Sequence, residues 1–391
     1  MIALIKNTFH NEEEIKKELV NFIQSTSRLS FGPECEKFES NFNLYQGRKH
    51  SVFLNSGSSA NLALIQALLN LGKLKKGDAV GFSALTWATN VMPLIQLGLN
   101  PIPVDVEADT LNVSSEKLKK VLLTAPLKAF FLTNLLGFCD DINEIRRLCG
   151  EKGIIFIEDN CESLGTVYQK KKLGNWGLAS TFSFFVGHHL STIEGGMVCT
   201  DDSELANELR MVRAHGWDRH LSSEAQGKLR GQFGIDDFYA RYSFYDLAYN
   251  LRPTEINGFL GNAQMPYMNE ITAKRRNNFM IFADAIYGKT DRYFPIRYDH
   301  IDFVSNFAVP IICRTKEIRD ELLKKCEGKI ETRPIVGGDI TKQPFFKKYV
   351  RDASAFENPN ASLIHKQGLY FGNNQDLTKD EIKQIIDIFA Q

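Results

Sequence analysis

Long apolar segments are missing from this sequence of 391 residues. No hydrophobic run approaches the roughly 20 residues that a membrane-spanning helix needs, and residues 129–132, for example, are only as long as a strand. Residues 1–7 lack the long apolar region and the small-residue cleavage site of a secretory signal. We therefore expect a cytoplasmic protein that has no membrane partner.

Paired cysteines are also missing. The seven cysteines are odd in number, widely spaced and without a Cys-x-x-Cys pair, which argues against a disulfide framework and against a zinc site. We predict no metal site, and no spacing typical of an iron–sulfur cluster is visible. Most of these cysteines are expected to be small apolar core residues, at positions 35, 139, 149, 161, 199, 313 and 326.

The sequence has no excess charge of either sign. Lys and Arg together number 47, as do Asp and Glu, so neither a nucleic-acid partner nor an anionic membrane surface is indicated. A hydrophobic content of 43% is ordinary for a globular protein, and the length is enough for two domains.

Strands and helices are predicted to alternate from about residue 50. Two helices come first, at residues 11–25 and 34–44, because apolar residues recur there with helical spacing. Strands at 52–54, 79–82, 101–104, 129–132 and 154–158 are then separated by helices at 58–71, 89–97, 114–123 and 142–152. This alternation predicts a mainly parallel α/β sheet covered on both faces, with ligands bound beyond the carboxyl ends of its strands.

The rest of the chain is predicted to be less regular. A helix at 203–215 precedes a polar stretch, residues 216–237, which we interpret as a long loop. A long helix at 264–285 then leads into a smaller α+β region with a strand at 308–313 and helices at 316–326 and 379–389. We therefore divide the chain into a large domain at 1–260, with an N-terminal helical arm, and a smaller C-terminal domain at 261–391.

Three features at predicted strand ends suggest a ligand site. Residues 55–61 (Asn-Ser-Gly-Ser-Ser-Ala-Asn) join a strand to a helix, where glycine and backbone amides favour a phosphate; the alternative is a simple helix-capping turn. Glu158 and Asp159 end another strand and suit a protonated ring nitrogen, or else cap a helix. Trp87 has the shape to stack on a planar ring, although core packing is the more common role of a single tryptophan taken alone.

The stretch 182–198 is the most specific part of the sequence. It is predicted to form a buried strand, a turn carrying His188 and His189, a Gly-Gly reversal and a second short strand. With the three features above, it resembles the DegT-type sugar aminotransferase and dehydratase family of fold type I pyridoxal phosphate enzymes, over nearly the whole chain. The resemblance implies a mainly parallel seven-stranded sheet in the large domain and a smaller α+β domain.

The resemblance also implies roles for individual residues. Residues 247–256 match the segment whose asparagine, Asn250 here, reaches the cofactor phosphate of a neighbouring subunit, so a homodimer with shared active sites is implied. The other implied cofactor contacts are Gly57, Ser58, Ser59 and Ser183 at the phosphate, Trp87 on the ring face, Asp159 at the pyridine nitrogen and Glu162 beside the ring.

His188 departs from the aminotransferase pattern, in which this position is the lysine that bonds covalently to the cofactor. Imidazole has no primary amine, so the cofactor would be held non-covalently, while His188 would still move protons as the catalytic acid and base. A purely structural pair of histidines is the alternative. This substitution is similar to that of the nucleotide-sugar 3-dehydratases, including those acting on GDP-4-keto-6-deoxymannose.

The similarity to that branch implies a reaction. The pyridoxamine phosphate form would condense with the 4-keto group of a nucleotide-linked 4-keto-6-deoxyhexose, and the 3-hydroxyl would leave. Hydrolysis would release ammonia and a 3-deoxy-4-keto sugar, with L-glutamate as the amino donor. A related branch also uses an iron–sulfur cluster, but the loop that would bind it has no cysteine here.

Two further residues are candidates for the substrate. His215 lies where the family contacts the sugar, although a histidine at a helix end before Gly216 also complements the helix dipole. Arg333 would pair with a diphosphate, or else it is a surface charge. The leading hypothesis is a 3-dehydratase of bacterial surface-polysaccharide synthesis; the alternatives are an aminotransferase that uses another lysine and a non-catalytic regulatory relative.

Overall fold

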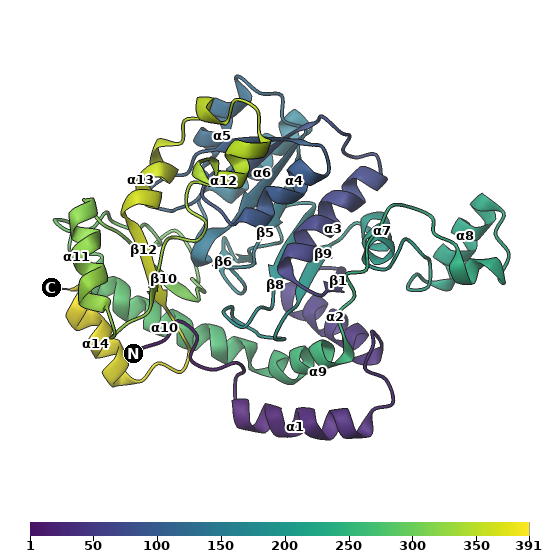
Figure 1. Cartoon of the computed structure of the whole chain (residues 1–391), viewed down its shortest axis with the longest axis horizontal. Helices are drawn as coiled ribbons and strands as arrows, with labels where there is room; N and C mark the ends of the chain where they lie inside the picture. Colours follow the sequence, from purple (N-terminus) through teal and green to yellow (C-terminus); the bar gives the residue numbers. More distant parts are fainter. Residues whose placement is uncertain (391) are drawn as a thin grey trace.

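A seven-stranded sheet forms the centre of the computed structural model, which describes residues 1–390 (Figure 1). The strand order is β1-β9-β8-β5-β4-β2-β3, and all neighbours are parallel except β9, which is antiparallel to both β1 and β8. The mainly parallel sheet predicted from the sequence is therefore confirmed. The strands are β1 (His50–Leu54), β2 (Ala79–Ser83), β3 (Asn100–Val104), β4 (Ala129–Thr133), β5 (Ile155–Asp159), β8 (Ala179–Ser183) and β9 (Gly196–Thr200).

Helices cover both faces of this sheet because its strands are apolar on both sides. Phe130 and Phe131 illustrate this, since neighbouring strand residues point to opposite faces and these two belong to different cores. The Phe131 face packs against α3 (Gly57–Asn70), α4 (Met92–Gln96) and α7 (Ser203–Arg213). The opposite face packs against α2 (Pro33–Gln46), α5 (Ser115–Leu122), α6 (Ile142–Lys152) and α10 (Met268–Ile286).

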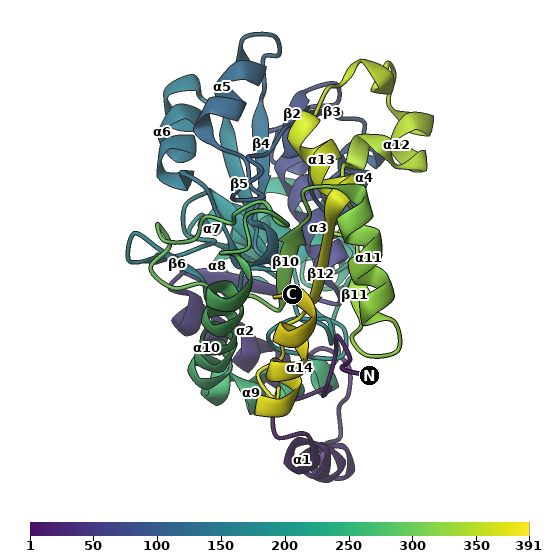
Figure 2. The ribbon, with the colours of Figure 1, turned by 90° about the vertical axis from the view of Figure 1, so that its left-hand side faces the viewer.

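A second sheet of three antiparallel strands lies in the C-terminal part of the chain, near both termini (Figure 2). Its order is β10-β12-β11, and its helices complete the predicted α+β region. The domain boundary proposed near residue 260 falls inside α9 (Glu255–Gln264). The elements of this part are β10 (Ala308–Ile312), β11 (Thr332–Arg333), β12 (Gly368–Gly372), α11 (Lys316–Cys326), α12 (Pro344–Tyr349), α13 (Pro359–Gln367) and α14 (Lys379–Phe389).

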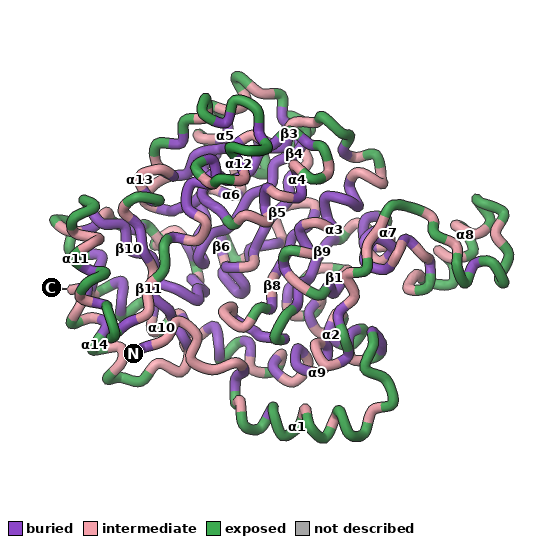
Figure 3. The backbone as a smooth tube through the Cα atoms, viewed as in Figure 1, coloured by how far each residue is buried: buried purple, intermediate pink, exposed green. Residues whose placement is uncertain are grey.

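Residues 216–247 form an arm that projects from the large sheet (Figure 1). The interpretation of residues 216–237 as a loop is wrong, because they contain the helix α8 (Ser223–Phe233). This helix buries no residue, so the sequence offered no amphipathic pattern to reveal it (Figure 3). Its ends are nevertheless capped, by the Ser222 side chain at the start and by Gly234 with a φ of 64° after the last turn.

The N-terminal helix α1 (Glu12–Ser25) lies apart from the sheets and packs on α9, where Phe22 stacks on Phe259 with ring centroids 4.7 Å apart. Proline shortens two predicted helices. Pro93 lies in the first turn of α4, so residues 88–90 form a separate 3₁₀ turn, and Pro266 similarly delays α10 to Met268. No described helix is both long and apolar enough to cross a bilayer.

Candidate active site

A cavity of about 350 Å³ opens at the carboxyl edge of the large sheet. This volume is within the range of small-molecule sites. The cavity is lined by residues of the large sheet, of the C-terminal region and of the N-terminal segment. They are Leu4, Ile5, Ser56, Gly57, Ser58, Trp87, Thr89, Asn90, Thr133, Asp159, Cys161, Glu162, Ser183, Phe185, Gly187, His188, Glu194, Phe307, Val336 and Tyr370.

Asp159 forms the buried floor of the cavity at the end of β5. Its Oδ2 accepts hydrogen bonds from the side-chain amides of Asn61 (3.0 Å) and Asn90 (2.7 Å), and its Oδ1 accepts one from the Cys161 N–H (2.8 Å). Three neutral donors orient this carboxylate without neutralising it by a cation. A charge held in this way attracts a protonated ring nitrogen.

Glu158, the other acid at the end of β5, has a different role. The alternation of strand residues turns it away from Asp159, and it is fully buried. Its carboxylate accepts hydrogen bonds from the backbone N–H groups of Gly174 (2.8 Å), Trp176 (2.7 Å) and Gly177 (2.7 Å). Glu158 therefore fixes a loop beneath the sheet and does not line the cavity.

The N-terminus of α3 forms one end of the cavity. Ser56 caps the helix by accepting a hydrogen bond from the Ser59 N–H (3.0 Å). Only glycine fits at position 57, because a Cβ there would lie 2.6 Å from the Cβ of Ser183. The backbone of the first turn and the hydroxyls of Ser58 and Ser183 thus meet at one point, which suits an anion such as a phosphate.

Ser59 does not line the cavity. Its hydroxyl donates a hydrogen bond to Asn55 Oδ1 (2.6 Å) and also contacts the Ser56 hydroxyl (2.9 Å), so it serves the local turn. Trp87 lies in the lining, and 54% of its surface is exposed. An indole of this exposure is available to stack on a planar ligand.

His188 lines the cavity from the turn between β8 and β9. Its Nδ1 lies 2.5 Å from the main-chain oxygen of Cys161, and because a carbonyl only accepts, Nδ1 carries the proton. Burial lowers the pKa of His188 to about 4, so the ring is neutral near pH 7. Nε2 then has a free lone pair and is the nitrogen that can take up a proton.

Two neighbours complete the surroundings of His188. Phe307 stacks on its ring with centroids 5.2 Å apart and an angle of 15° between the planes. Burial, together with the charge of Asp159, raises the pKa of Glu162 to about 8, although the Leu136 N–H donates to its carboxyl group (2.9 Å). Near neutral pH, Glu162 is therefore mostly protonated and can donate a hydrogen bond to a ligand.

Besides Ser59, three predicted site residues lie outside the cavity lining. Asn250 is exposed, and its Oδ1 accepts a hydrogen bond from Arg252 Nε (3.0 Å). His215 has a φ of 60° at the end of α7 and packs against Trp217, with ring centroids 4.8 Å apart. Arg333 is on β11 opposite Tyr370, which does line the cavity, and its guanidinium pairs with Glu331.

Several lining residues were not predicted from the sequence. Asn61 follows Gly57 by one helical turn, so helical spacing placed it on the same side of α3, and that signal was available. Some of the others adjoin predicted residues, as Ser56 does, whereas Leu4, Thr133 and Phe307 come from distant segments that only the tertiary fold gathers. The unpredicted residues at or beneath the cavity surface are Leu4, Ile5, Ser56, Asn61, Thr89, Asn90, Thr133, Cys161, Phe185, Gly187, Glu194, Phe307, Val336 and Tyr370.

The arrangement fits a planar aromatic cofactor that carries a phosphate and a ring nitrogen. The α3 N-terminus suits the phosphate, the Trp87 indole suits the ring face, and the Asp159 carboxylate suits the nitrogen. No lysine is among the described residues that line the cavity, so a covalent attachment through an ε-amine has no candidate there.

Comparison with known proteins identifies relatives of the whole chain. The model of the DegT/DnrJ/EryC1/StrS aminotransferase family matches residues 10–390. A GDP-4-keto-6-deoxy-D-mannose 3-dehydratase of Yersinia pseudotuberculosis is 37% identical over 383 residues, which are 96% of each chain. These matches extend beyond the cavity to nearly every element of the fold.

Two solved structures are similarly close. One is a GDP-4-keto-6-deoxymannose-3-dehydratase with a trapped PLP-glutamate geminal diamine, at a TM-score of 0.89 and 31% identity, with all of both chains covered. The other is a histidine-to-asparagine mutant of such an enzyme with bound GDP-perosamine, at a TM-score of 0.88 and 30% identity, again with all of both chains covered. The predicted fold class, that of the fold type I aminotransferases, is confirmed.

Proposed function

The chain belongs to the DegT/DnrJ/EryC1/StrS aminotransferase family, and we propose that within this family it is a 3-dehydratase. Its substrate is a nucleotide-linked 4-keto-6-deoxyhexose, for which GDP-4-keto-6-deoxymannose is the first choice because of the relatives. Pyridoxal phosphate and its pyridoxamine form are the cofactor, held without a covalent bond. L-Glutamate is the amino donor.

The observation that carries this proposal is the imidazole of His188 at the position where the family's aminotransferases have a lysine. His188 lines the cavity, and no described lysine does so. An enzyme without that amine has no group of its own to displace an amino sugar from the cofactor. Water therefore completes the reaction, and nitrogen leaves as ammonia.

The residues of the cavity bind and orient the cofactor. Ser58, Ser183 and the first turn of α3, including Gly57, hold the phosphate; Ser59 contributes by supporting this turn. Trp87 covers one face of the ring, Asp159 pairs with the pyridine nitrogen, and Glu162 lies beside the ring. The bound cofactor supplies an amine that condenses with the sugar's 4-keto group and a ring that accepts electrons.

His188 moves the proton. Its neutral Nε2 accepts a proton within the cavity, and the resulting imidazolium is the acid that protonates the departing 3-hydroxyl, which leaves as water. The hydrogen bond from Nδ1 to the Cys161 carbonyl keeps the proton on that nitrogen and persists when the ring is charged. One residue thus acts as base and then as acid.

The overall change balances without a further reductant. Glutamate becomes 2-oxoglutarate and ammonia, and the oxygen lost from carbon 3 of the sugar is matched by the oxygen gained by 2-oxoglutarate. The two electrons that convert the C–O bond at carbon 3 of the sugar into a C–H bond come from the C–H bond at the α-carbon of glutamate. The chain needs no iron–sulfur cluster for this reaction.

Two residues outside the cavity lining are proposed to bind the nucleotide sugar. His215, beside Trp217, contacts the sugar, and Arg333, beside the cavity residue Tyr370, pairs with the diphosphate. The exposed guanidinium and its Glu331 partner leave Arg333 able to change partners at low cost.

The enzyme is further proposed to be a homodimer that completes each active site with Asn250 of the other chain. The surface around Asn250 supports this proposal. Large hydrophobic side chains just before Asn250 are uncovered, as is typical of a protein–protein contact. They are Phe238, Tyr239, Tyr242, Phe244 and Leu247, each at least 59% exposed.

We also place the enzyme in the cytoplasm. All seven cysteines are free thiols in the structure, which is typical of a reducing compartment. The two-domain division at residue 260 remains part of the proposal.

Ammonia release tests the proposed function. The protein is incubated with pyridoxal phosphate, glutamate and, in separate reactions, the GDP-, CDP-, UDP- and dTDP-linked 4-keto-6-deoxy sugars. We expect equal amounts of ammonia and 2-oxoglutarate with the GDP sugar. A stable 4-amino sugar without ammonia would instead assign aminotransferase activity, and no turnover of any sugar would favour a non-catalytic relative.

A further inference from the structure

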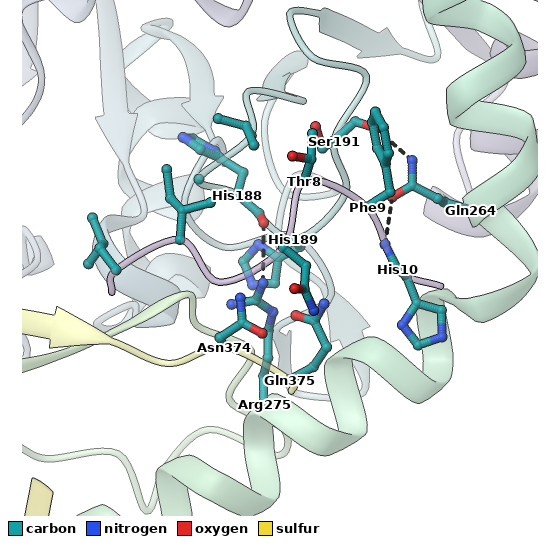
Figure 4. Close-up of a pocket in the computed structure, with 15 residues that line it drawn as sticks. Thr8, Phe9, His10, His188, His189, Ser191, Gln264, Arg275, Asn374 and Gln375 are labelled. Carbon is teal, nitrogen blue, oxygen red and sulfur yellow. Dashed lines mark hydrogen bonds between the residues drawn. The ribbon is translucent and has the colours of Figure 1, made fainter. Parts of the chain in front are cut away.

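Arg275 lies beside the His188-His189 turn (Figure 4) and is not among the residues that line the active-site cavity. It extends from α10 and is 4% exposed. A narrow second cavity there is bounded by both histidines, by the N-terminal residues Thr8 and His10 and by Asn374 after β12. Arg275 is therefore in contact with the large sheet's catalytic turn and with the C-terminal region.

Main-chain carbonyls are the partners of this buried guanidinium. Its Nη2 donates to the main-chain oxygen of His188 (3.3 Å), and its Nη1 donates to the main-chain oxygen of Asn373. Among residues 1–390, no carboxylate forms an ion pair with Arg275. Burying an arginine is costly, and burial lowers the pKa of Arg275 to about 10, although the negative charge of the nearby Asp376 opposes this shift.

The same residue also reaches the ring of His188, through a short chain of contacts. The Asn373 side-chain amide donates to the main-chain oxygen of Arg275 (2.8 Å) and to Asn306 Oδ1 (2.8 Å). Asn306 precedes Phe307, whose ring stacks on the His188 imidazole. The bond to the Arg275 main-chain oxygen is available to any residue at position 275, but the guanidinium itself also holds Asn373 through its main-chain oxygen. The guanidinium thus supports the backbone of His188 directly and the plane of its ring through Asn373, Asn306 and Phe307.

We propose that Arg275 is a positioning residue for proton transfer at His188. It fixes the backbone of the turn directly and the stacking surface of the ring through Asn373 and Phe307, so that Nδ1 stays bonded to the Cys161 carbonyl and Nε2 remains the proton acceptor. This inference rests on the proposed function of His188 but concerns a residue outside the cavity.

The positive charge of Arg275 also helps to keep the His188 ring neutral. Burial is the main cause of the low pKa of His188, the bond to Cys161 and the charge of Asp159 oppose it, and the positive charge of Arg275 lowers it further. Removing this charge is therefore expected to raise the pKa of His188. The other titratable groups around the two cavities are Cys161, Glu162, His189, Glu194, His10 and Tyr370.

Nitrogen NMR of the 15N-histidine-labelled protein tests the proposal without any substrate. The variants are Arg275→Gln, Arg275→Lys and, as a matched control, Arg276→Gln, which removes the neighbouring charge of α10 from a side chain that lies over Phe303. In the wild type and the control we expect His188 to be protonated at Nδ1 and neutral near pH 7. In Arg275→Gln its titration midpoint should rise by about one pH unit, and the Nε2-protonated tautomer should appear. An unchanged tautomer and midpoint would overturn the proposal.

Kinetics provide the second readout. For Arg275→Gln we expect kcat to fall about tenfold or more while KM stays within about twofold, because the base is displaced but the substrate contacts remain. Arg275→Lys, which keeps the charge, should keep the low midpoint and recover part of kcat. If circular dichroism shows that Arg275→Gln does not fold, the Arg275→Lys variant tests the proposal instead. A kcat equal to that of the wild type in Arg275→Lys would then contradict the proposal. Absence of ammonia release by the wild type would reject the proposed function, while the NMR result would still decide the role of Arg275.

Discussion

At the scale of single residues, an imidazole and a primary amine differ in what they can do beside a carbonyl compound. The amine forms a Schiff base with it, whereas the imidazole has no primary amine for that bond but can exchange a proton. His188 has one nitrogen committed to the Cys161 carbonyl and a pKa lowered to about 4, so it is a weak base held in one tautomer. The surrounding residues compensate by fixing its position.

Replacing His188 by Asn tests this role. We expect His188→Asn to bind pyridoxal phosphate as the wild type does, because the phosphate and nitrogen contacts are untouched. Turnover should fall by about 10²- to 10⁴-fold, the usual contribution of acid–base catalysis. The absorbance of bound cofactor and the rate of ammonia release are the measurements.

His300→Asn is a matched control for that substitution. His300 also bonds to a main-chain carbonyl, that of Cys139 (2.9 Å), but it does not line the cavity. Its loss should leave the turnover number close to that of the wild type. Equal losses in the two variants would show that the effect at His188 is structural.

Because the pKa of Glu162 is raised by burial, we expect the stability of the cofactor-free protein to depend on pH. This pKa rises from 4.5 to about 8 on folding because the carboxyl group is buried. The folded state therefore binds the proton more tightly than the unfolded state, and this contribution is complete below about pH 4.5 and lost as the pH rises toward 8.

Thermal unfolding across that range checks this prediction. The Tm of Glu162→Gln should fall less between these pH values than that of the wild type, since an amide does not titrate. Glu116→Gln, which changes an exposed carboxylate of α5, should follow the wild-type curve. If the Tm of Glu162→Gln fell with pH as steeply as that of the wild type, another group, such as the buried Glu208, would be the main cause of the pH dependence.

At the scale of elements, Gly258 lies where α9 and α2 pack closely together. A Cβ at Gly258 would lie 2.5 Å from the Cys35 backbone nitrogen, so Gly258→Ala forces the two helices apart. We expect the free energy of unfolding to fall by about 1–3 kcal/mol, as in other overpacked sites.

Gly231 is the matched position in α8. A Cβ there meets nothing within 4 Å, so Gly231→Ala should be neutral or stabilise by up to about 1 kcal/mol through helix propensity. Urea unfolding of both variants is the measurement. A stable Gly258→Ala variant would contradict the packing of α2 on α9.

The same elements show how far the sequence was predictive. The strands that end near Thr133 and Asp159 were recognised from apolar runs and local motifs, since each is a short-range feature. The strand expected from Phe182 onward lies earlier in the chain, because β8 covers Ala179–Ser183. α8 was missed because it buries nothing, and the split before α4 depends on one proline. Leu4 and Phe307 reach the cavity only through tertiary contacts, which one sequence does not display.

At the scale of the whole molecule, the proposed dimer predicts complementation between two inactive chains. In a mixed dimer of His188→Asn and Asn250→Ala chains, one of the two sites has both His188 and Asn250 intact if each site takes its asparagine from the other chain. With random mixing, half of the dimers are mixed, so about a quarter of wild-type activity should return. No recovery would place Asn250 in the site of its own chain or outside both.

The mass of the sugar product tests the central claim, that His188 directs this fold toward removing a hydroxyl. The wild-type protein is incubated with pyridoxal phosphate, excess glutamate and GDP-4-keto-6-deoxymannose, and the nucleotide product is analysed by mass spectrometry and NMR. We expect a product lighter than the substrate by one oxygen atom, with a methylene group at carbon 3 and the keto group retained. A product that keeps the 3-hydroxyl and carries nitrogen at carbon 4 would contradict the central claim.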